Sequence, residues 1–264
     1  MAGIIDQATE CDRPPVALFS HCFTCNKDLK AIVRISRFLA EHGITVLRYD
    51  MTGLGNSGGN FAETNFTTNL ADLHAAARFL QEEYSPPAAL LGLSFGGAAS
   101  LAAATKANVA RHACWNRLSA VATLAAPSDT QHLATLMLQM NPQIGQRGNG
   151  EVTIGGRQWT ITEQMIEDFR RHQLPDRITE IAVPLLICHS PSDSTVGYEE
   201  ALRILQLAST QPQEDEQRPP VSLLTLDHAD HLLSTDPRDL PFVAEMIAAF
   251  VHRYAGSAAG NESA

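Results

Sequence analysis

The sequence is poor in positive charge. It has 19 lysines and arginines against 29 aspartates and glutamates, which gives a formal net charge of −10 over 264 residues. No run of basic residues interrupts this acidic character. Because an acidic protein repels phosphate backbones, we expect no nucleic-acid partner.

Long apolar runs are also missing. No stretch reaches the roughly 18 apolar residues that span a membrane. The start, MAGIIDQATECDRPP, lacks the basic and apolar segments of a signal peptide. We therefore expect no membrane association and a cytoplasmic location. At 44% hydrophobic residues the composition is that of an ordinary globular chain, and we expect residues 1–264 to form one domain.

Cysteine is scarce, and the number of cysteines is odd. The five thiols are Cys11, Cys22, Cys25, Cys114 and Cys188. Scattered cysteines in a chain without an export signal predict reduced thiols rather than a disulfide framework.

Short apolar runs alternate with longer segments of helical period. The apolar runs span 16–20, 45–50, 88–93, 118–126, 183–190 and 221–226. The helical segments span 28–42, 67–84, 95–106, 197–208 and 240–254. Such continuous apolar runs are typical of strands buried on both faces of a parallel sheet. The alternation predicts an α/β fold with a mostly parallel, doubly wound sheet, and residues 2–6 could add an antiparallel edge strand.

Residues 128–180 break this alternation. They contain a helical stretch at 131–140, followed by EVTIGGRQWTI, in which Gly155 and Gly156 separate two alternating runs. That pattern predicts a β-hairpin. We interpret 128–180 as a small lid insertion, and we expect the small, polar tail from about 255 onward to be flexible.

One serine stands between glycines at the end of an apolar run. Gly92-Leu93-Ser94-Phe95-Gly96 matches the G-x-S-x-G pattern between an expected strand and an expected helix. In a nucleophile elbow this sharp turn exposes the serine hydroxyl, and the crowded neighbours must be small. The pattern makes Ser94 a candidate nucleophile, whereas the alternative is a passive serine in a glycine-rich turn.

A nucleophilic serine needs a base, and the base needs a carboxylate that orients it. Asp193 and His231 follow the last two expected strands, in the chain order Ser, Asp, His that elbow enzymes use. We therefore predict Ser94, Asp193 and His231 as the catalytic residues. His228, in the same loop as His231, is the alternative base, and Asp129 is the reserve acid.

These motifs resemble those of the α/β-hydrolase superfamily. The likeness is carried by GLSFGG, PSDSTV and ADHLL. LFSHCFTCNKD (18–28) and LRYDMTGLGNSGG (47–59) further resemble a bacterial subgroup whose hydrolase domain is often fused to an OsmC-like peroxide-reducing domain.

The resemblance implies the α/β-hydrolase fold and a hydrolase that acts on a small-molecule acyl substrate. It also implies an oxyanion hole formed by the backbone N–H groups of Phe23 and Phe95. A functional link to an OsmC-like protein would follow from it, and no metal or cofactor is required.

Two other motifs offer different functions. Cys22-Phe23-Thr24-Cys25 is a C-x-x-C between a strand and a helix, as in thiol redox proteins. A milder hypothesis is that peroxide lowers hydrolase activity through Cys22. The glycines of GLGNSG (53–58) match a dinucleotide fingerprint only weakly, because no helix starts directly after them.

The pattern as a whole predicts a serine hydrolase that cleaves carboxylic esters through an acyl-enzyme intermediate. A thioesterase or peptidase of the same fold and a C-x-x-C redox protein remain as alternatives.

Overall fold

A seven-stranded sheet forms the centre of the protein in the computed structural model, which describes residues 1–9, 13–210 and 218–255. In sheet order its strands are β1 (Gly3–Asp6), β3 (Thr45–Tyr49), β2 (Val16–Ser20), β4 (Ala89–Leu93), β5 (Ala120–Leu124), β8 (Leu185–His189) and β9 (Val221–Thr225). Only β1 is antiparallel to its neighbour, so the expected parallel sheet and its antiparallel edge strand are both confirmed. Cys11 and the tail after 255 lie outside the described residues.

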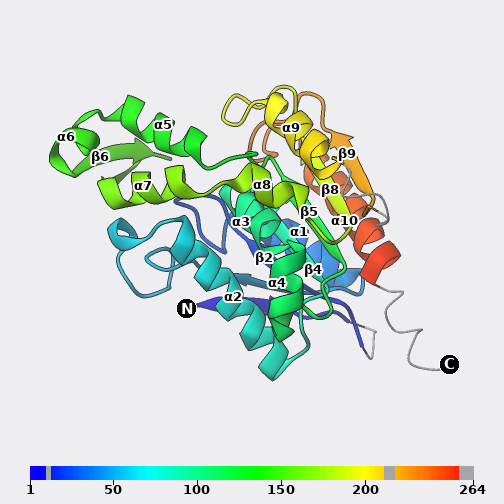
Figure 1. The fold of residues 1–264 in the computed structure, drawn as a ribbon. Helices are drawn as coiled ribbons and strands as arrows, with labels where there is room; N and C mark the ends of the chain where they lie inside the picture. The colour runs from blue at the N-terminus through cyan, green and yellow to red at the C-terminus, as the bar shows by residue number, and fades with distance from the viewer. Residues whose placement is uncertain (10–12, 211–217, 256–264) are drawn as a thin grey trace.

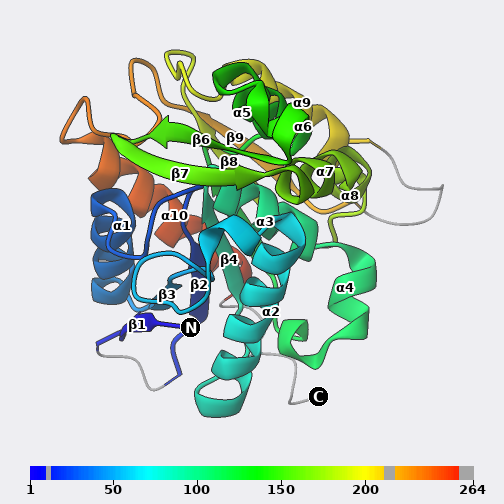
Figure 2. The same ribbon diagram turned by 90° about the vertical axis from the view of Figure 1, so that its left-hand side faces the viewer.

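Helices cover both faces of the sheet (Figures 1 and 2). One face carries α1 (Lys30–Glu41) and α10 (Asp239–Ala255). The other carries α2 (Phe66–Glu83), α3 (Phe95–Ala103), α8 (Leu174–Thr179) and α9 (Tyr198–Ala208). In the described part of the chain no helix has the length and apolar character that crossing a bilayer requires.

Both faces of each central strand are buried, which explains the continuous apolar runs. In β2, Leu18 packs into the core under α2 and α3, while Phe19 packs into the core under α1 and α10. Successive side chains of a strand point to opposite faces, so a strand between two helical layers needs apolar residues at every position.

The helix expected over 95–106 is α3, which is three residues shorter, and a helix that was not expected follows it. α3 ends at Ala103, and α4 (Lys106–Arg111) starts after Thr105, whose side chain accepts a hydrogen bond from Asn108 N. A threonine in this capping position favours the start of a new helix. Two short 3-10 helices, Phe61–Glu63 and Ala113–Trp115, complete this side of the molecule.

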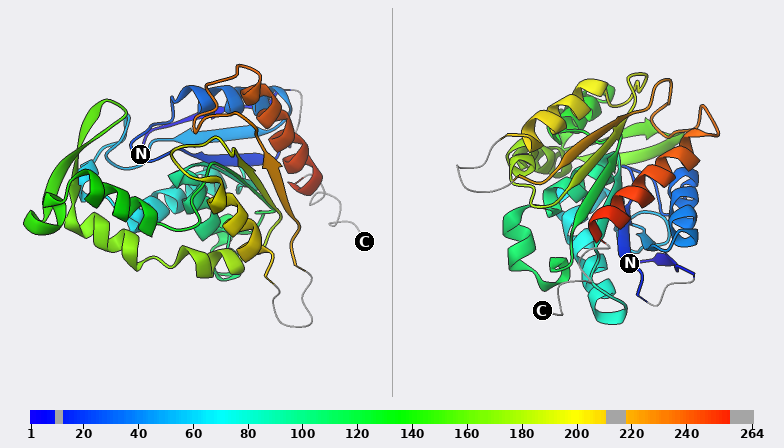
Figure 3. Two further views of the ribbon diagram at one scale, coloured as in Figure 1. Left: turned by 90° about the horizontal axis from the view of Figure 1, so that it is seen from above. Right: turned by 90° about the vertical axis from the view of Figure 1, so that its right-hand side faces the viewer.

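The insertion at 128–180 contains the expected hairpin and more helix than expected. Ahead of α8, which covers the sheet, its elements are α5 (Gln131–Met140), α6 (Gln143–Arg147), β6 (Asn149–Ile154), β7 (Arg157–Thr162) and α7 (Glu163–Arg171). Gly155 and Gly156 have φ values of +59° and +75° and form the hairpin turn. Seen from above, this group lies at the opposite end of the molecule from α10 (Figure 3). Its function as a lid stays a prediction.

The insertion is attached to the start of α2. Asp168 of α7 accepts hydrogen bonds from Thr67 N at 3.0 Å and from Thr67 Oγ1 at 2.6 Å. The first N–H groups of a helix have no partner within the helix, so a carboxylate there satisfies one and complements the helix dipole. The carboxylate therefore joins the insertion to the sheet-covering layer.

Candidate active site

Ser94 occupies the sharp turn between β4 and α3. Its backbone has φ 53° and ψ −118°, a conformation that non-glycine residues seldom adopt. Ser94 N donates to Leu124 O of the neighbouring strand at 2.7 Å, and the residue is partly exposed. This is the strand–turn–helix geometry of a nucleophile elbow.

The glycines around Ser94 are required by close backbone packing. A Cβ on Gly92 would lie 2.3 Å from Gly96 O, and a Cβ on Gly96 would lie 2.3 Å from Ser20 O at the end of β2. Any side chain at these positions would therefore force the elbow away from the sheet.

Asp193 and His231 meet at the same end of the sheet. Asp193 follows β8 and His231 follows β9, and His231 Nδ1 lies 2.7 Å from Asp193 Oδ2. The other carboxylate oxygen accepts hydrogen bonds from Thr195 N at 2.8 Å and Val196 N at 3.0 Å. Burial by itself would raise the pKa of Asp193. The hydrogen bonds from His231 and the two amides outweigh it, so this pKa is lowered.

The contact with Asp193 determines how His231 can act. An ionised carboxylate only accepts hydrogen bonds, so Nδ1 of His231 carries the hydrogen and Nε2 of the neutral ring is an acceptor. Ser94 lies at the carboxyl end of β4, two strands from β8. Within the described residues the structure records no hydrogen bond between Ser94 and His231. It therefore brings the predicted base and the predicted acid into contact, while their roles and a contact with Ser94 stay predictions.

The two reserve residues lie elsewhere. The His228 side chain is 87% exposed, and its Nε2 lies 3.3 Å from Asp227 Oδ2. Asp129 forms an ion pair with Arg203 at 2.9 Å on the surface. Among the described residues, no group of three or more histidine, cysteine or carboxylate side chains could hold a metal ion.

His21 joins the loop after β2 to the loop after β3. Its Nδ1 lies 2.8 Å from Cys22 O, and Met51 N donates to its Nε2 at 3.1 Å. Nε2 is therefore the acceptor, and Nδ1 carries the hydrogen. Burial chiefly lowers the pKa of His21, which keeps the ring neutral.

Aromatic rings connect the two candidate oxyanion residues to the insertion. The centroids of the Phe23 and Phe95 rings are 5.4 Å apart, and Phe169 of α7 lies 5.9 Å from the first and 5.4 Å from the second. Phe95 is also the first residue of α3, so its N–H has no acceptor within that helix.

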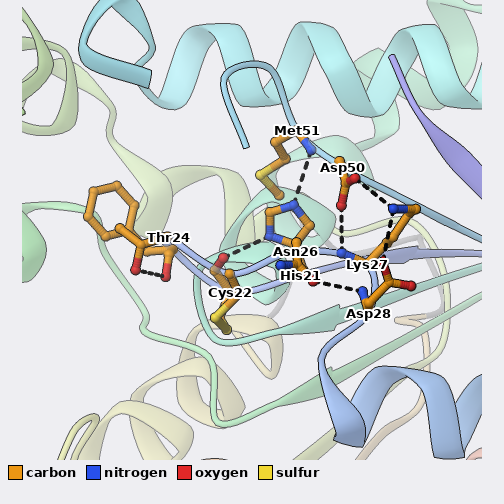
Figure 4. Close-up of a disulfide and its surroundings, with 10 residues drawn as sticks. His21, Cys22, Thr24, Asn26, Lys27, Asp28, Asp50 and Met51 are labelled. Carbon is orange, nitrogen blue, oxygen red and sulfur yellow. Dashed lines mark hydrogen bonds and ion pairs between the residues drawn. A yellow bond between two sulfur atoms is a disulfide. The ribbon is translucent and has the colours of Figure 1, made fainter. Parts of the chain in front are cut away.

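The expectation of reduced thiols is wrong for two of the five cysteines. Cys22 and Cys25 form a disulfide, with Cα atoms 5.3 Å apart (Figure 4). Cys114 and Cys188 are free and buried, and burial raises the pKa of Cys188 to about 12. The thioredoxin-like arrangement is also absent, because α1 begins at Lys30 and not at the C-x-x-C.

A buried ion pair, which the sequence analysis did not identify, holds the loop after β2 in place. Lys27 Nζ lies 2.9 Å from Asp50 Oδ2, and neither residue is more than 5% exposed. Lys27 N donates to Asp50 Oδ1 at 2.7 Å. A Cβ on Gly55, where φ is +54°, would lie 2.3 Å from the Asp50 carboxylate. Gly55, in the loop after β3, therefore leaves room for the Asp50 carboxylate. The signal for this pair in the sequence was Asp50, a charged residue directly after the buried strand β3.

His189 is a buried histidine beside Asp193 that the sequence did not single out. Its Nε2 lies 2.8 Å from Val196 O and 3.6 Å from Asp193 Oδ2, and its buried Nδ1 has no partner among the described residues. Burial chiefly lowers the pKa of His189. A neutral imidazole therefore packs behind the Asp193 carboxylate.

Known proteins with this architecture include esterases and a thioesterase. The chain is 38% identical to the esterase domain of a Rhodothermus marinus protein, over 95% of this chain and 92% of that one, with a TM-score of 0.69. Est1E of Butyrivibrio proteoclasticus, solved with ferulic acid, is 20% identical over 96% and 94% of the two chains, with a TM-score of 0.77. Mitochondrial palmitoyl-protein thioesterase ABHD10 of Rattus norvegicus is 23% identical over 82% of this chain and 69% of its own length.

The family model described as serine aminopeptidase, S33 (Hydrolase_4) matches residues 25–174. The match includes the elbow and ends before Asp193. Because it spans more than half of the chain, and the sheet and elbow agree with it, the protein belongs to this family of α/β-hydrolases.

Proposed function

We propose that this α/β-hydrolase cleaves carboxylic esters of small acyl compounds, with Ser94 as nucleophile, His231 as base and Asp193 as orienting acid. The observation that carries the proposal is the 2.7 Å contact between His231 Nδ1 and Asp193 Oδ2. The position of Ser94 at a positive-φ elbow supports it.

In the proposed reaction, His231 Nε2 takes the proton from Ser94 Oγ, which attacks the ester carbonyl carbon. The proton then passes to the departing alcohol, and an acyl-enzyme remains on Ser94. Water, deprotonated by His231, attacks the acyl carbon and releases the acid. Asp193 holds the Nδ1–H tautomer and stabilises the imidazolium that forms in each half.

The N–H groups of Phe23 and Phe95 would bind the oxygen that gains negative charge. Preorganised donors of this kind stabilise the transition state, and the loss of one typically lowers the rate by a factor of about 10²–10³. The packing of the two phenylalanine rings against each other supports a common position for the two amides.

The test is turnover of p-nitrophenyl esters together with labelling by a fluorophosphonate. Ser94→Ala should abolish both while the circular dichroism spectrum is kept. Ser85→Ala is the matched control, because Ser85 precedes β4 at the opposite end of the sheet and binds Arg117. Ester turnover by Ser94→Ala at the wild-type rate would refute the assignment.

A thioesterase is the second candidate function, favoured by the similarity to palmitoyl-protein thioesterase ABHD10. The same steps would then release a thiol instead of an alcohol. Comparing kcat/KM for an acyl ester and the matching acyl thioester separates the two. An aminoacyl anilide tests the peptidase alternative. The cytoplasmic location and the link to an OsmC-like protein also remain proposals, which rest on the sequence alone.

A further inference from the structure

The disulfide closes the turn that carries the Phe23 amide. Cys25 N donates to Cys22 O at 3.1 Å, so residues 22–25 form a tight turn with the disulfide across it. Inside the turn Thr24 has φ 61°. A β-branched residue seldom adopts this conformation, and the turn therefore needs an external constraint.

Hydrogen bonds anchor both ends of this loop, whereas its middle is held by the disulfide and by packing of the Phe23 ring against neighbouring phenylalanine rings. His21 accepts a hydrogen bond from Met51 N on one side, and Lys27 binds Asp50 on the other (Figure 4). Lys27 Nζ also donates to Asn56 Oδ1 at 2.8 Å. Between these anchors, Thr24 Oγ1 donates to Phe23 O at 2.7 Å, which is a contact within the turn itself. The disulfide is thus the covalent restraint on the segment that presents the Phe23 amide.

The two cysteines differ in accessibility. Cys22 is buried at 4% exposure, whereas Cys25 is partly exposed at the surface of the turn. An external thiolate can therefore reach the Cys25 side of the bond more readily than the Cys22 side, and exchange depends on such access.

We propose that the Cys22–Cys25 disulfide is a thiol-reducible site that controls hydrolase activity, with the oxidised form active; this inference rests on the proposed function. A dithiol attacks Cys25 Sγ, and Cys22 leaves as a thiolate that takes up a proton. The second thiol of the reductant then attacks the mixed disulfide and releases Cys25. Two electrons and two protons pass to the protein, and the reductant becomes a cyclic disulfide. Without the bond, Thr24 leaves its left-handed conformation, and the Phe23 N–H no longer points toward the position of the oxyanion. The direction is the reverse of the expectation that peroxide lowers activity.

The experiment treats the intact protein with dithiothreitol and follows p-nitrophenyl butyrate turnover. We expect kcat to fall by roughly tenfold or more, within the ~10²–10³ that loss of one oxyanion donor allows, with KM little changed. Oxidised dithiothreitol should restore it. Iodoacetamide labelling and mass spectrometry establish whether Cys22 and Cys25 are reduced, and circular dichroism establishes that the fold persists.

Two variants complete the test. Cys25→Ser should have the low kcat of the reduced protein with and without dithiothreitol, whereas Cys114→Ser, at a free buried thiol, should respond as the wild type does. Unchanged kcat with both thiols labelled would overturn the proposal. So would a bond that dithiothreitol leaves intact in the folded protein. Failure of the proposed function has a different signature, namely no ester turnover in the oxidised wild type or full turnover by Ser94→Ala.

Discussion

His231 Nδ1 lies 2.7 Å from Asp193 Oδ2, and two backbone amides hold the other oxygen of that carboxylate. Because both oxygens of the carboxylate are hydrogen-bonded, the carboxylate cannot rotate freely, and it holds the imidazole in one orientation. Residues 38 positions apart in the chain thereby form one unit.

Asp193→Asn should leave the protein folded and lower kcat for esters by about 10³–10⁴, because the amide can stabilise the wrong imidazole tautomer. Steady-state kinetics across pH measures this. Asp129→Asn is the control, since Asp129 contacts Arg203 on the surface, and it should change kcat less than twofold. Equal effects of the two variants would contradict the assignment of the acid.

His231→Gln should remove ester turnover almost completely, because no other base contacts Asp193 at hydrogen-bond distance in the described residues. His228→Gln should keep wild-type kcat, since this side chain is 87% exposed. Parallel assays at pH 8 compare the two. If His228→Gln is the inactive variant, the base has been wrongly assigned.

Gly96→Ala should destabilise the protein by about 1–3 kcal/mol or more, because the new methyl would lie 2.3 Å from Ser20 O. Gly58→Ala meets nothing within 4 Å and should change the free energy of unfolding by less than about 0.5 kcal/mol. Urea unfolding measures both. Similar values for the two would argue against the close packing of β4, α3 and β2.

Lys27→Met should lower the free energy of unfolding by about 3–5 kcal/mol, because it leaves the Asp50 carboxylate buried without its counter-charge. Arg78→Met breaks an exposed ion pair with Glu82 and should lower the free energy of unfolding by less than about 0.5 kcal/mol. Denaturant unfolding at pH 7 provides the comparison. A cost below 1 kcal/mol for Lys27→Met would mean that the pair contributes little to the loop.

His21 should make the protein less stable as the pH falls. Burial lowers its pKa from 6.5 in the folded state, so below about pH 6.5 the unfolded chain binds a proton that the folded protein refuses. The free energy of unfolding should therefore fall by up to about 1.4 kcal/mol per pH unit from this group. Unfolding at pH 7.0, 6.0 and 5.5 should give a smaller slope for His21→Asn than for the wild type. Identical slopes would exclude this contribution.

The strands and the elbow could be predicted because their signals are local. A strand buried on both faces is apolar at every position, and the elbow requires glycines within two residues of Ser94. The expected helix at 95–106 ran past the end of α3, because apolar residues continue to Ala104, and the six-residue helix α4 was not expected. The helices α6, α7 and α8 have five, nine and six residues, which is shorter than the window of about 11–18 residues over which a helical pattern can be recognised.

The amino-acid pattern alone was enough to identify the fold class, the central strands and the hairpin, since each is signalled by apolar and glycine patterns among neighbours along the chain. Three features needed the folded coordinates, namely the Lys27–Asp50 pair, the packing of His189 behind Asp193 and the oxidation of Cys22 and Cys25. The first two join atoms that only the sheet brings together or removes from water. The third goes together with a turn in which Thr24 is left-handed and the Cα atoms of the two cysteines are 5.3 Å apart, and the spacing of the cysteines alone does not reveal that turn.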